Sequence, residues 1–147
     1  MRAVCLVVLA SCLAVSAHAG AAPPRANEAS AAKLVRQKFT AFERHDVGGI
    51  KATYAADAVL HSPDYPKLEG NGPIADTYRK LFTAIPDAKD NIKTFDVIGG
   101  RVYVQFVLEG HWGGAANKAL HVPIMSVYTV QGGYIVNDAT YYDRKAP

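Results

Sequence analysis

The 147-residue chain carries 16 basic and 13 acidic side chains, a formal net charge of +3, and 50% hydrophobic residues. No basic run is interleaved with aromatic residues, so nucleic-acid binding is not indicated. Both cysteines, Cys5 and Cys12, lie in an N-terminal segment that we expect to be removed, which excludes disulfides and cysteine chemistry from the mature protein. Roughly 125 residues then remain, enough for one domain but not for two.

Residues 1–19 have the pattern of a secretory signal peptide. Arg2 supplies the positive charge, Val4 to Val15 form an apolar run, and Ala17-His18-Ala19 is a small-x-small cleavage site. We therefore expect cleavage after Ala19 and a periplasmic or secreted protein. The apolar run is too short to span a membrane. The alternative is a lipoprotein anchored at Cys12.

Residues 20–29 are expected to be a flexible lead-in to one domain over residues 30–147. From Ser30 to His45 the apolar residues recur at helical spacing, and this pattern predicts an amphipathic helix. The side chains expected mostly on its outer side are Lys33, Arg36, Lys38 and Glu43. After a break over residues 46–49, Ile50 to Ala55 is predicted to be a second, short helical piece.

A short strand is predicted from Ala58 to His61, ended by a segment with two prolines, which cannot donate to a β-ladder. Gly70-Asn71-Gly72-Pro73 then opens a third helix, because proline in a first turn lacks only a donor that would be unused there. Pro86-Asp87 ends that helix.

Four strands are predicted in the rest of the chain, over Asn91 to Ile98, Arg101 to Trp112, Ala119 to Val130 and Tyr134 to Tyr142. Gly99-Gly100 and Gly132-Gly133 are expected to be two-residue hairpin turns. In the second of these strands apolar residues alternate, from Val102 to Leu108, so one face should be buried. Helices followed by strands in hairpins predict an α+β fold, with about three helices on one face of a curved antiparallel sheet.

Several local motifs, in this order, resemble the nuclear transport factor 2-like superfamily, and most closely its SnoaL-like (polyketide-cyclase-like) branch. The motifs are Tyr54-Ala55-Ala56-Asp57-Ala58, Phe82-Thr83-Ala84-Ile85-Pro86-Asp87, His111-Trp112-Gly113, the hairpin from Tyr128 to Ile135, and Tyr142-Asp143. The resemblance implies a cone-shaped domain with a pocket between the concave face of the sheet and the helices, often paired through the outer face of the sheet. Such domains include several enzyme types and non-catalytic binders, so the fold does not give the function.

The catalytic positions of these relatives carry different groups in this chain. Ser62 stands where steroid-isomerase-like members have a carboxylate base, and Lys38 falls near their tyrosine oxyanion donor. Ser126 stands at the aspartate base of SnoaL-like cyclases, whereas the family histidine is retained at His111. A serine alcohol does not accept a proton unaided at neutral pH, so the usual base is missing.

Two histidines, His111 and His61, are the candidate proton-transfer groups, because imidazole titrates near neutral pH. Simple alternation puts His111 opposite Leu108, so it reaches the pocket only if the strand bulges near Glu109-Gly110. Alternation likewise separates His61 from Ser62. His121 faces away from the pocket unless Pro123 inserts a bulge.

In the last strand, Asp138 is out of phase with Asn137, Tyr141 and Asp143, so only one set faces the pocket. The resemblance places the second set inside. The predicted binding residues are Tyr54, Trp112, Ser126, Asn137 and Tyr141. No spacing typical of a metal site, a phosphate-binding glycine loop or a nucleophilic serine occurs, so no metal or cofactor is expected.

The resulting hypothesis is an exported protein that binds a small apolar or aromatic molecule, without certain catalysis, as a homodimer paired through the outer face of the sheet. The alternative is an enzyme of the cyclase, isomerase or hydrolase type that uses His111 and His61 for proton transfer. A third hypothesis is a protein-interaction module with a vestigial pocket. Placement of the two histidines around one cavity would favour the enzyme.

Overall fold

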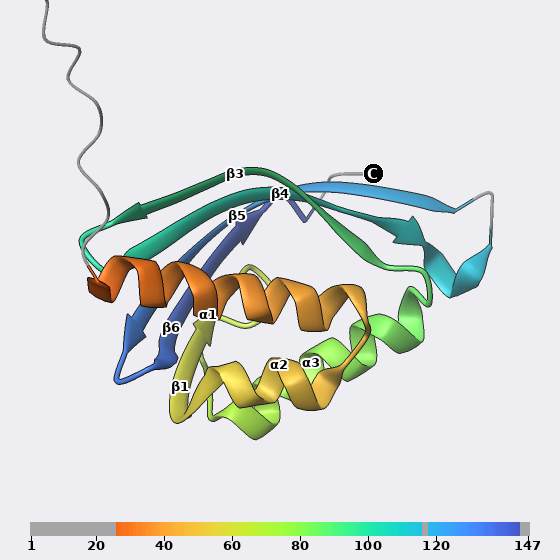
Figure 1. The fold of residues 1–147 in the computed structure, drawn as a ribbon. Helices are drawn as coiled ribbons and strands as arrows, with labels where there is room; N and C mark the ends of the chain where they lie inside the picture. Colours follow the sequence, from red (N-terminus) through yellow and green to blue (C-terminus); the bar gives the residue numbers. More distant parts are fainter. Residues whose placement is uncertain (1–25, 116–117, 145–147) are drawn as a thin grey trace, which may run out of the picture.

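The computed structural model describes residues 26–115 and 118–144, in which three helices cover one face of a six-stranded sheet (Figure 1). The expected signal peptide and Cys12 lie outside these residues. The elements are α1 (Ala26–Glu43), α2 (Val47–Thr53), β1 (Tyr54–His61), β2 (Leu68–Glu69), α3 (Asn71–Ala84), β3 (Lys89–Ile98), β4 (Arg101–His111), a 3-10 turn (Trp112–Gly114), β5 (Ala119–Gln131) and β6 (Tyr134–Tyr142). The α+β class and the helix-covered sheet are confirmed. None of the described helices is long and apolar enough to cross a membrane.

The strand order in the sheet is β2-β1-β6-β5-β4-β3. All neighbouring pairs are antiparallel except β1 and β6, which run parallel. The sheet is therefore mixed, whereas a purely antiparallel sheet was expected. Between β1 and β6 the chain forms β2, α3, β3, β4, the 3-10 turn and β5. No hairpin therefore constrains their relative direction.

The two glycine pairs make the predicted hairpin turns. Gly99 and Gly100 have φ angles of 58° and 79°, and Gly132 and Gly133 have φ angles of 58° and 82°. Positive φ at both central residues is the geometry whose twist matches that of the flanking strands, and only glycine adopts it without strain. These turns set the register of β3 on β4 and of β5 on β6.

The core lies between α1 and the concave face of the sheet, where β3, β4 and β5 arch over the helix (Figure 1). The predicted inner face of β4 is confirmed, since Val102, Val104, Phe106 and Leu108 are all buried. The Phe39 ring of α1 packs edge-on against Phe106, with 5.2 Å between ring centroids. This contact is part of the support for the inner end of the site described below.

Several element boundaries differ from the predictions. Helix α1 begins at Ala26 rather than Ser30, and α2 ends at Thr53, so that Tyr54 opens β1 instead of continuing the helix. The Asp46 side chain accepts a hydrogen bond from the Gly49 backbone at 2.8 Å and so starts α2 earlier than expected. The two-residue strand β2 was not predicted.

Strand β6 contains a bulge that reverses its faces. Thr129 of β5 pairs with Asn137, but the next residue, Val130, pairs with Ile135, so Val136 is an extra residue. A bulge shifts the alternation of side chains by one. Ile135 and Asp138 are therefore both buried, although their spacing is odd.

Candidate functional site

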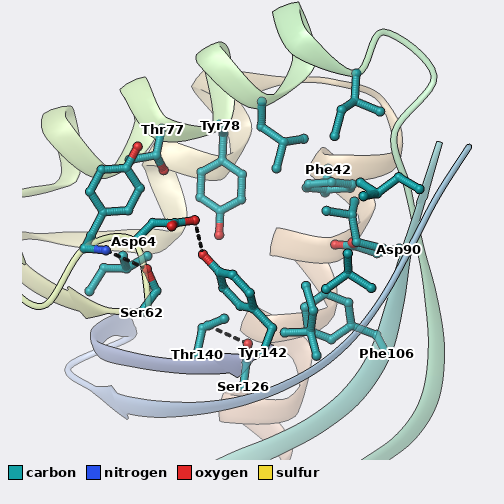
Figure 2. A pocket seen from close by; sticks show the side chains of 18 of the residues that line it. Phe42, Ser62, Asp64, Thr77, Tyr78, Asp90, Phe106, Ser126, Thr140 and Tyr142 are labelled. Carbon is teal, nitrogen blue, oxygen red and sulfur yellow. Dashed lines mark hydrogen bonds between the residues drawn. The ribbon is translucent and has the colours of Figure 1, made fainter. Parts of the chain in front are cut away.

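A cavity of about 560 Å³ lies between α1, α3 and the concave face of the sheet (Figure 2). Natural small-molecule sites occupy about 300–1,000 Å³, so the volume suits a ligand of that kind. Phe106 and Trp112 form part of the wall, and their side chains do not fill the cavity. Much of the wall is apolar and comes from α1, β1, α3 and the inward residues of β4 and β5, namely Phe42, Leu60, Leu81, Ile85, Phe106, Leu108, Leu120, Val122 and Ile124.

A chain of hydrogen-bonded polar groups lies against this apolar wall. Tyr54 donates to Asp138 Oδ2 at 2.6 Å, and Thr140 donates to Asp138 Oδ1 at 2.8 Å. The Tyr78 hydroxyl lies 3.2 Å from that of Tyr54, and Ser126 Oγ lies 2.6 Å from Thr140 Oγ1. Tyr78 and Ser126 both line the cavity, so the chain connects two parts of its wall through a buried carboxyl group.

Burial determines the protonation of this chain. It raises the pKa of Asp138, against the lowering effects of Lys38 and of the hydrogen bonds from Tyr54 and Thr140. Burial and the neighbouring Asp138 charge also raise the pKa of Tyr54 well above its ordinary value, and burial raises that of Tyr78. Both tyrosines are therefore neutral hydroxyl groups at physiological pH.

Lys38 is the buried cation of the cavity. Its side chain leaves α1, lines the cavity and is only 2% exposed. The ammonium donates to the Tyr128 hydroxyl at 3.3 Å. Burial by itself lowers the pKa of Lys38. The acidic groups around it together raise the pKa by more than burial lowers it, so the net pKa lies above the ordinary lysine value. Lys38 is therefore charged at neutral pH.

Five aromatic rings surround the Lys38 ammonium. The distances from Nζ to the ring centroids run from 4.3 Å to 5.9 Å. Rings at this distance attract a cation through their negative faces, which offsets part of the loss of hydration. The rings belong to Phe39, Phe42, Tyr78, Phe106 and Tyr128.

Asp90 lines the cavity at the start of β3, on the same side as Phe42 and Phe106 (Figure 2). Its backbone N–H donates to Glu43 Oε1 at 3.0 Å. Burial raises the pKa of Asp90 from 3.8 to about 7, against the lowering effect of Lys38 and with a further increase from Glu43. Asp90 is therefore largely protonated below neutral pH.

This raised pKa predicts a pH-dependent stability. Between about pH 4 and pH 7 the unfolded chain has released the Asp90 proton and the folded chain retains it, so stability falls as the pH rises. We expect Asp90→Asn to be more stable than wild type by about 1–2 kcal/mol at about pH 8, since water in the cavity screens part of the penalty. The difference should vanish near pH 4. Urea unfolding at several pH values measures it, with Asp57→Asn at an exposed position of β1 as the control. An unchanged pH profile in Asp90→Asn would contradict the expectation.

The mouth of the cavity has an aromatic and a charged side. Trp112, which is 48% exposed, lines the cavity just after β4 ends. From β6, Tyr142 donates to the Asp64 carboxylate, which also pairs with Arg144 at 3.0 Å. Burial, together with the Asp64 hydrogen bond, raises the pKa of Tyr142 to about 12, so its hydroxyl is neutral.

The structure places both candidate histidines outside the lining of the cavity. The pairing of β4 with β5 is unbroken from Arg101 to His111, so the bulge that His111 needed is absent. The His111 ring instead donates to Asp87 at 2.6 Å, and the His61 ring donates to the Pro66 carbonyl at 2.6 Å. His121 also faces outward, because β5 runs through Pro123 without a shift in register.

The other predicted site residues divide between the two faces of the sheet. Trp112 and Ser126 line the cavity, whereas Tyr54 lies behind the wall, with its hydroxyl 3.2 Å from that of Tyr78. Asn137 and Tyr141 do not line it, contrary to the expectation, because the bulge in β6 turns Asp138 and Thr140 inward. Tyr141 is 62% exposed.

Sequence reasoning missed Lys38 and Asp138 as site residues. A signal for Lys38 exists, because it lies three residues after Val35 and four before Phe42, on the buried stripe of α1. The prediction that Lys38 lies on the outer side of the helix was therefore wrong. The inward direction of Asp138 depends on the position of the bulge in β6, which the sequence pattern did not reveal. Among the described residues, no group of three or more His, Cys, Asp or Glu is placed to hold a metal ion.

The fold and the cavity are those of a curved sheet covered by helices, which is the architecture that the motif resemblance implied. The family model described as SnoaL-like domain matches residues 35–137, and the chain belongs to that family. No curated protein matches the sequence.

Solved structures show the same fold at low sequence identity. A putative SnoaL-like polyketide cyclase from Jannaschia sp. CCS1 superimposes with a TM-score of 0.73 at 17% identity, over 83% of this chain and 91% of that one. A hypothetical protein with a ketosteroid-isomerase-like fold from Catenulispora acidiphila DSM 44928, in complex with trimethylamine, gives 0.70 at 20% identity, over 78% and 88%. An LEH-like epoxide hydrolase from M. tuberculosis gives 0.68 at 17% identity, over 79% and 84%.

Proposed function

We propose that this protein binds a small, mainly apolar or aromatic molecule in the cavity between the helices and the sheet. The observation that carries the proposal is a cavity of about 560 Å³ with a mainly apolar wall. Side chains do not fill it, although the core of the domain beside it is well packed. Burial of apolar ligand surface in such a cavity is favourable by about 25 cal/mol per Å². The polar groups of the wall include Lys38, Tyr128 and members of the hydrogen-bonded chain through Asp138, and these groups can orient a ligand.

The test compares two tryptophan substitutions on the same strand. Val122→Trp places a large ring in the cavity, whereas Val127→Trp places it on the outer face of β5. We expect a neutral aromatic probe, 2-naphthalenemethanol, to bind wild type and Val127→Trp alike in calorimetric titrations, and Val122→Trp at least about tenfold more weakly. Circular dichroism checks that both variants fold. Equal binding by a folded Val122→Trp, or no binding to wild type, would refute the proposal.

Native mass spectrometry gives an independent readout. Protein purified from the cells that produce it should carry a small molecule that is lost on denaturation. The mass of that molecule would identify the natural ligand directly.

An enzyme remains the second candidate, on a different set of residues from His111 and His61. The favouring observation is the hydrogen-bonded chain from Ser126 through Asp138 to Tyr78, which could move a proton between two points of the cavity wall. Exchange of the α-hydrogens of 2-decalone in D₂O, followed by NMR, tests this. Exchange that is faster with wild type than with Asp138→Asn would favour the enzyme, and exchange at the buffer rate would exclude it for this ketone class.

We also propose that the mature protein acts outside the cytoplasm as a homodimer paired through the outer face of the sheet. The pattern of residues 1–19 supports export. Exposed Tyr134 and Tyr141 on β6 are apolar surface that pairing could cover. N-terminal sequencing of the exported protein, and sedimentation velocity of the purified protein, test the two proposals. A retained leader and a monomer would refute them.

A further inference from the structure

We propose that the ligand carries an anionic oxygen, of a carboxylate or phenolate group, which binds the Lys38 ammonium and the Tyr128 hydroxyl at the inner end of the cavity. This inference rests on the proposed function, because it names the polar end of the molecule that the apolar wall would hold. It assigns a role to a buried lysine that the apolar wall alone does not explain.

The Lys38 ammonium lacks a charged partner at contact distance. Among residues 26–115 and 118–144, no carboxylate oxygen lies within 4.0 Å of Nζ. An ammonium has three N–H donors, and the hydrogen bond to Tyr128 uses one of them. Burying a charge without a counter-charge is unfavourable, so an anion that enters the cavity would compensate an existing penalty.

The nearby carboxyl groups Asp138 and Asp90 act on this charge from beyond contact distance. Asp138 already accepts hydrogen bonds from Tyr54 and Thr140. Asp90 lies at the cavity wall, and its pKa of about 7 leaves it about half protonated at neutral pH and largely protonated in mildly acidic conditions. The positive charge of Lys38 therefore remains available to a ligand.

Tyr128 completes the subsite beside Lys38. Its hydroxyl accepts the hydrogen bond from Nζ and lines the same cavity. A neutral phenol that accepts one hydrogen bond still has its own proton to donate, so both groups can donate to one ligand oxygen. Burial raises the pKa of Tyr128 far above its ordinary value, which keeps this hydroxyl a donor.

The Lys38 ammonium makes the subsite selective for the sign of the ligand charge. Phe42, Tyr78 and Phe106 line the cavity, and the Lys38 ammonium already lies against their rings. A cationic ligand would meet like charge there, at low dielectric, with its aromatic contacts taken. A neutral ligand gains from the apolar wall but brings no charge to pair with the ammonium.

The experiment titrates three naphthalene probes of matched shape by calorimetry: anionic 2-naphthoate, neutral 2-naphthalenemethanol and cationic 2-naphthylmethylammonium. We expect wild type to bind the anion about tenfold or more tightly than the neutral probe, the affinity that one hydrogen bond to a charged group contributes, and to bind the cation most weakly. In Lys38→Met the anion should lose this preference, while the affinity of the neutral probe stays within about threefold. The control is Lys33→Met, an exposed lysine on the same helix, which should keep the preference.

Tyr128→Phe keeps the test decisive if Lys38→Met does not fold. It retains the ring and removes the second donor, so the preference for the anion should fall by about threefold or more. Failure of wild type to bind any of the three probes would overturn the proposed function. Equal binding of all three probes, or an undiminished preference in folded Lys38→Met or Tyr128→Phe, would overturn the anion subsite alone.

Discussion

Asp138→Ala is expected to lower the free energy of unfolding by about 3 kcal/mol. Asp138 is fully buried and accepts hydrogen bonds from Tyr54 and Thr140, at 2.6 Å and 2.8 Å. Alanine removes both acceptors, so the Tyr54 and Thr140 hydroxyl groups lose their hydrogen bonds to the carboxyl group, each at a cost of about 1–3 kcal/mol. Urea denaturation at pH 7 measures the loss.

Asp138→Asn is the matched control for this variant. Its amide oxygen can still accept one of the two hydrogen bonds without a charge, so we expect about half the loss. A destabilisation of Asp138→Ala below about 1 kcal/mol would show that water or a rearranged side chain satisfies the Tyr54 and Thr140 donors. The hydrogen-bonded chain of polar groups would then not be a rigid part of the site.

Gly110→Ala is expected to be destabilised by about 2–3 kcal/mol, although it adds a single methyl group. A Cβ at this position would lie 2.4 Å from Ile85 Cγ2 and 3.3 Å from Ala88 Cα, and the backbone has a φ of +155°. Ile85 lines the cavity, so its displacement should also weaken binding of the neutral probe. Thermal unfolding and the calorimetric titration described above measure the two effects.

Gly72→Ala provides the comparison for the glycine prediction. Its Cβ would meet nothing within 4 Å, and it lies in the first turn of α3. Alanine favours helix over glycine by up to about 1 kcal/mol, so this variant should match or exceed the wild-type stability. If both alanine variants were equally stable, the close packing of β4 on the end of α3 would not hold in solution.

Much of the architecture could be predicted because its signals are local. A tight two-residue hairpin turn requires positive φ angles, which Gly-Gly pairs adopt without strain, so both turns were predicted correctly. Alternation from Val102 to Leu108 correctly predicted the inner face of β4, where the strand is regular. The parallel pairing of β1 with β6 could not be predicted in this way, because it joins segments that are distant in the chain.

The candidate site was predicted less completely, because its polar residues depend on long-range geometry. Trp112 and Ser126 were among the predicted binding residues, and both line the cavity. The family resemblance placed Asn137 and Tyr141 inside, whereas the structure turns Asp138 and Thr140 inward after the extra residue at Val136. Lys38 was placed mostly on the outer side of the helix because the predicted apolar stripe left it out, although it is buried with Val35 and Phe42.

The sequence by itself therefore determined the family, the order of helices and strands, the hairpin turns and the apolar inner face of β4. These features follow from local periodicity, from the φ angles that glycine allows and from the order of the motifs. Each of these signals can be read from residues that are close together in the chain. Only the tertiary structure decided that His111 binds Asp87, that Asp138 faces inward and that the Lys38 ammonium lies in a cavity among aromatic rings. Those placements depend on the register of paired strands and on which side chains α1, α3 and the sheet bring together, and neither is encoded within a single element.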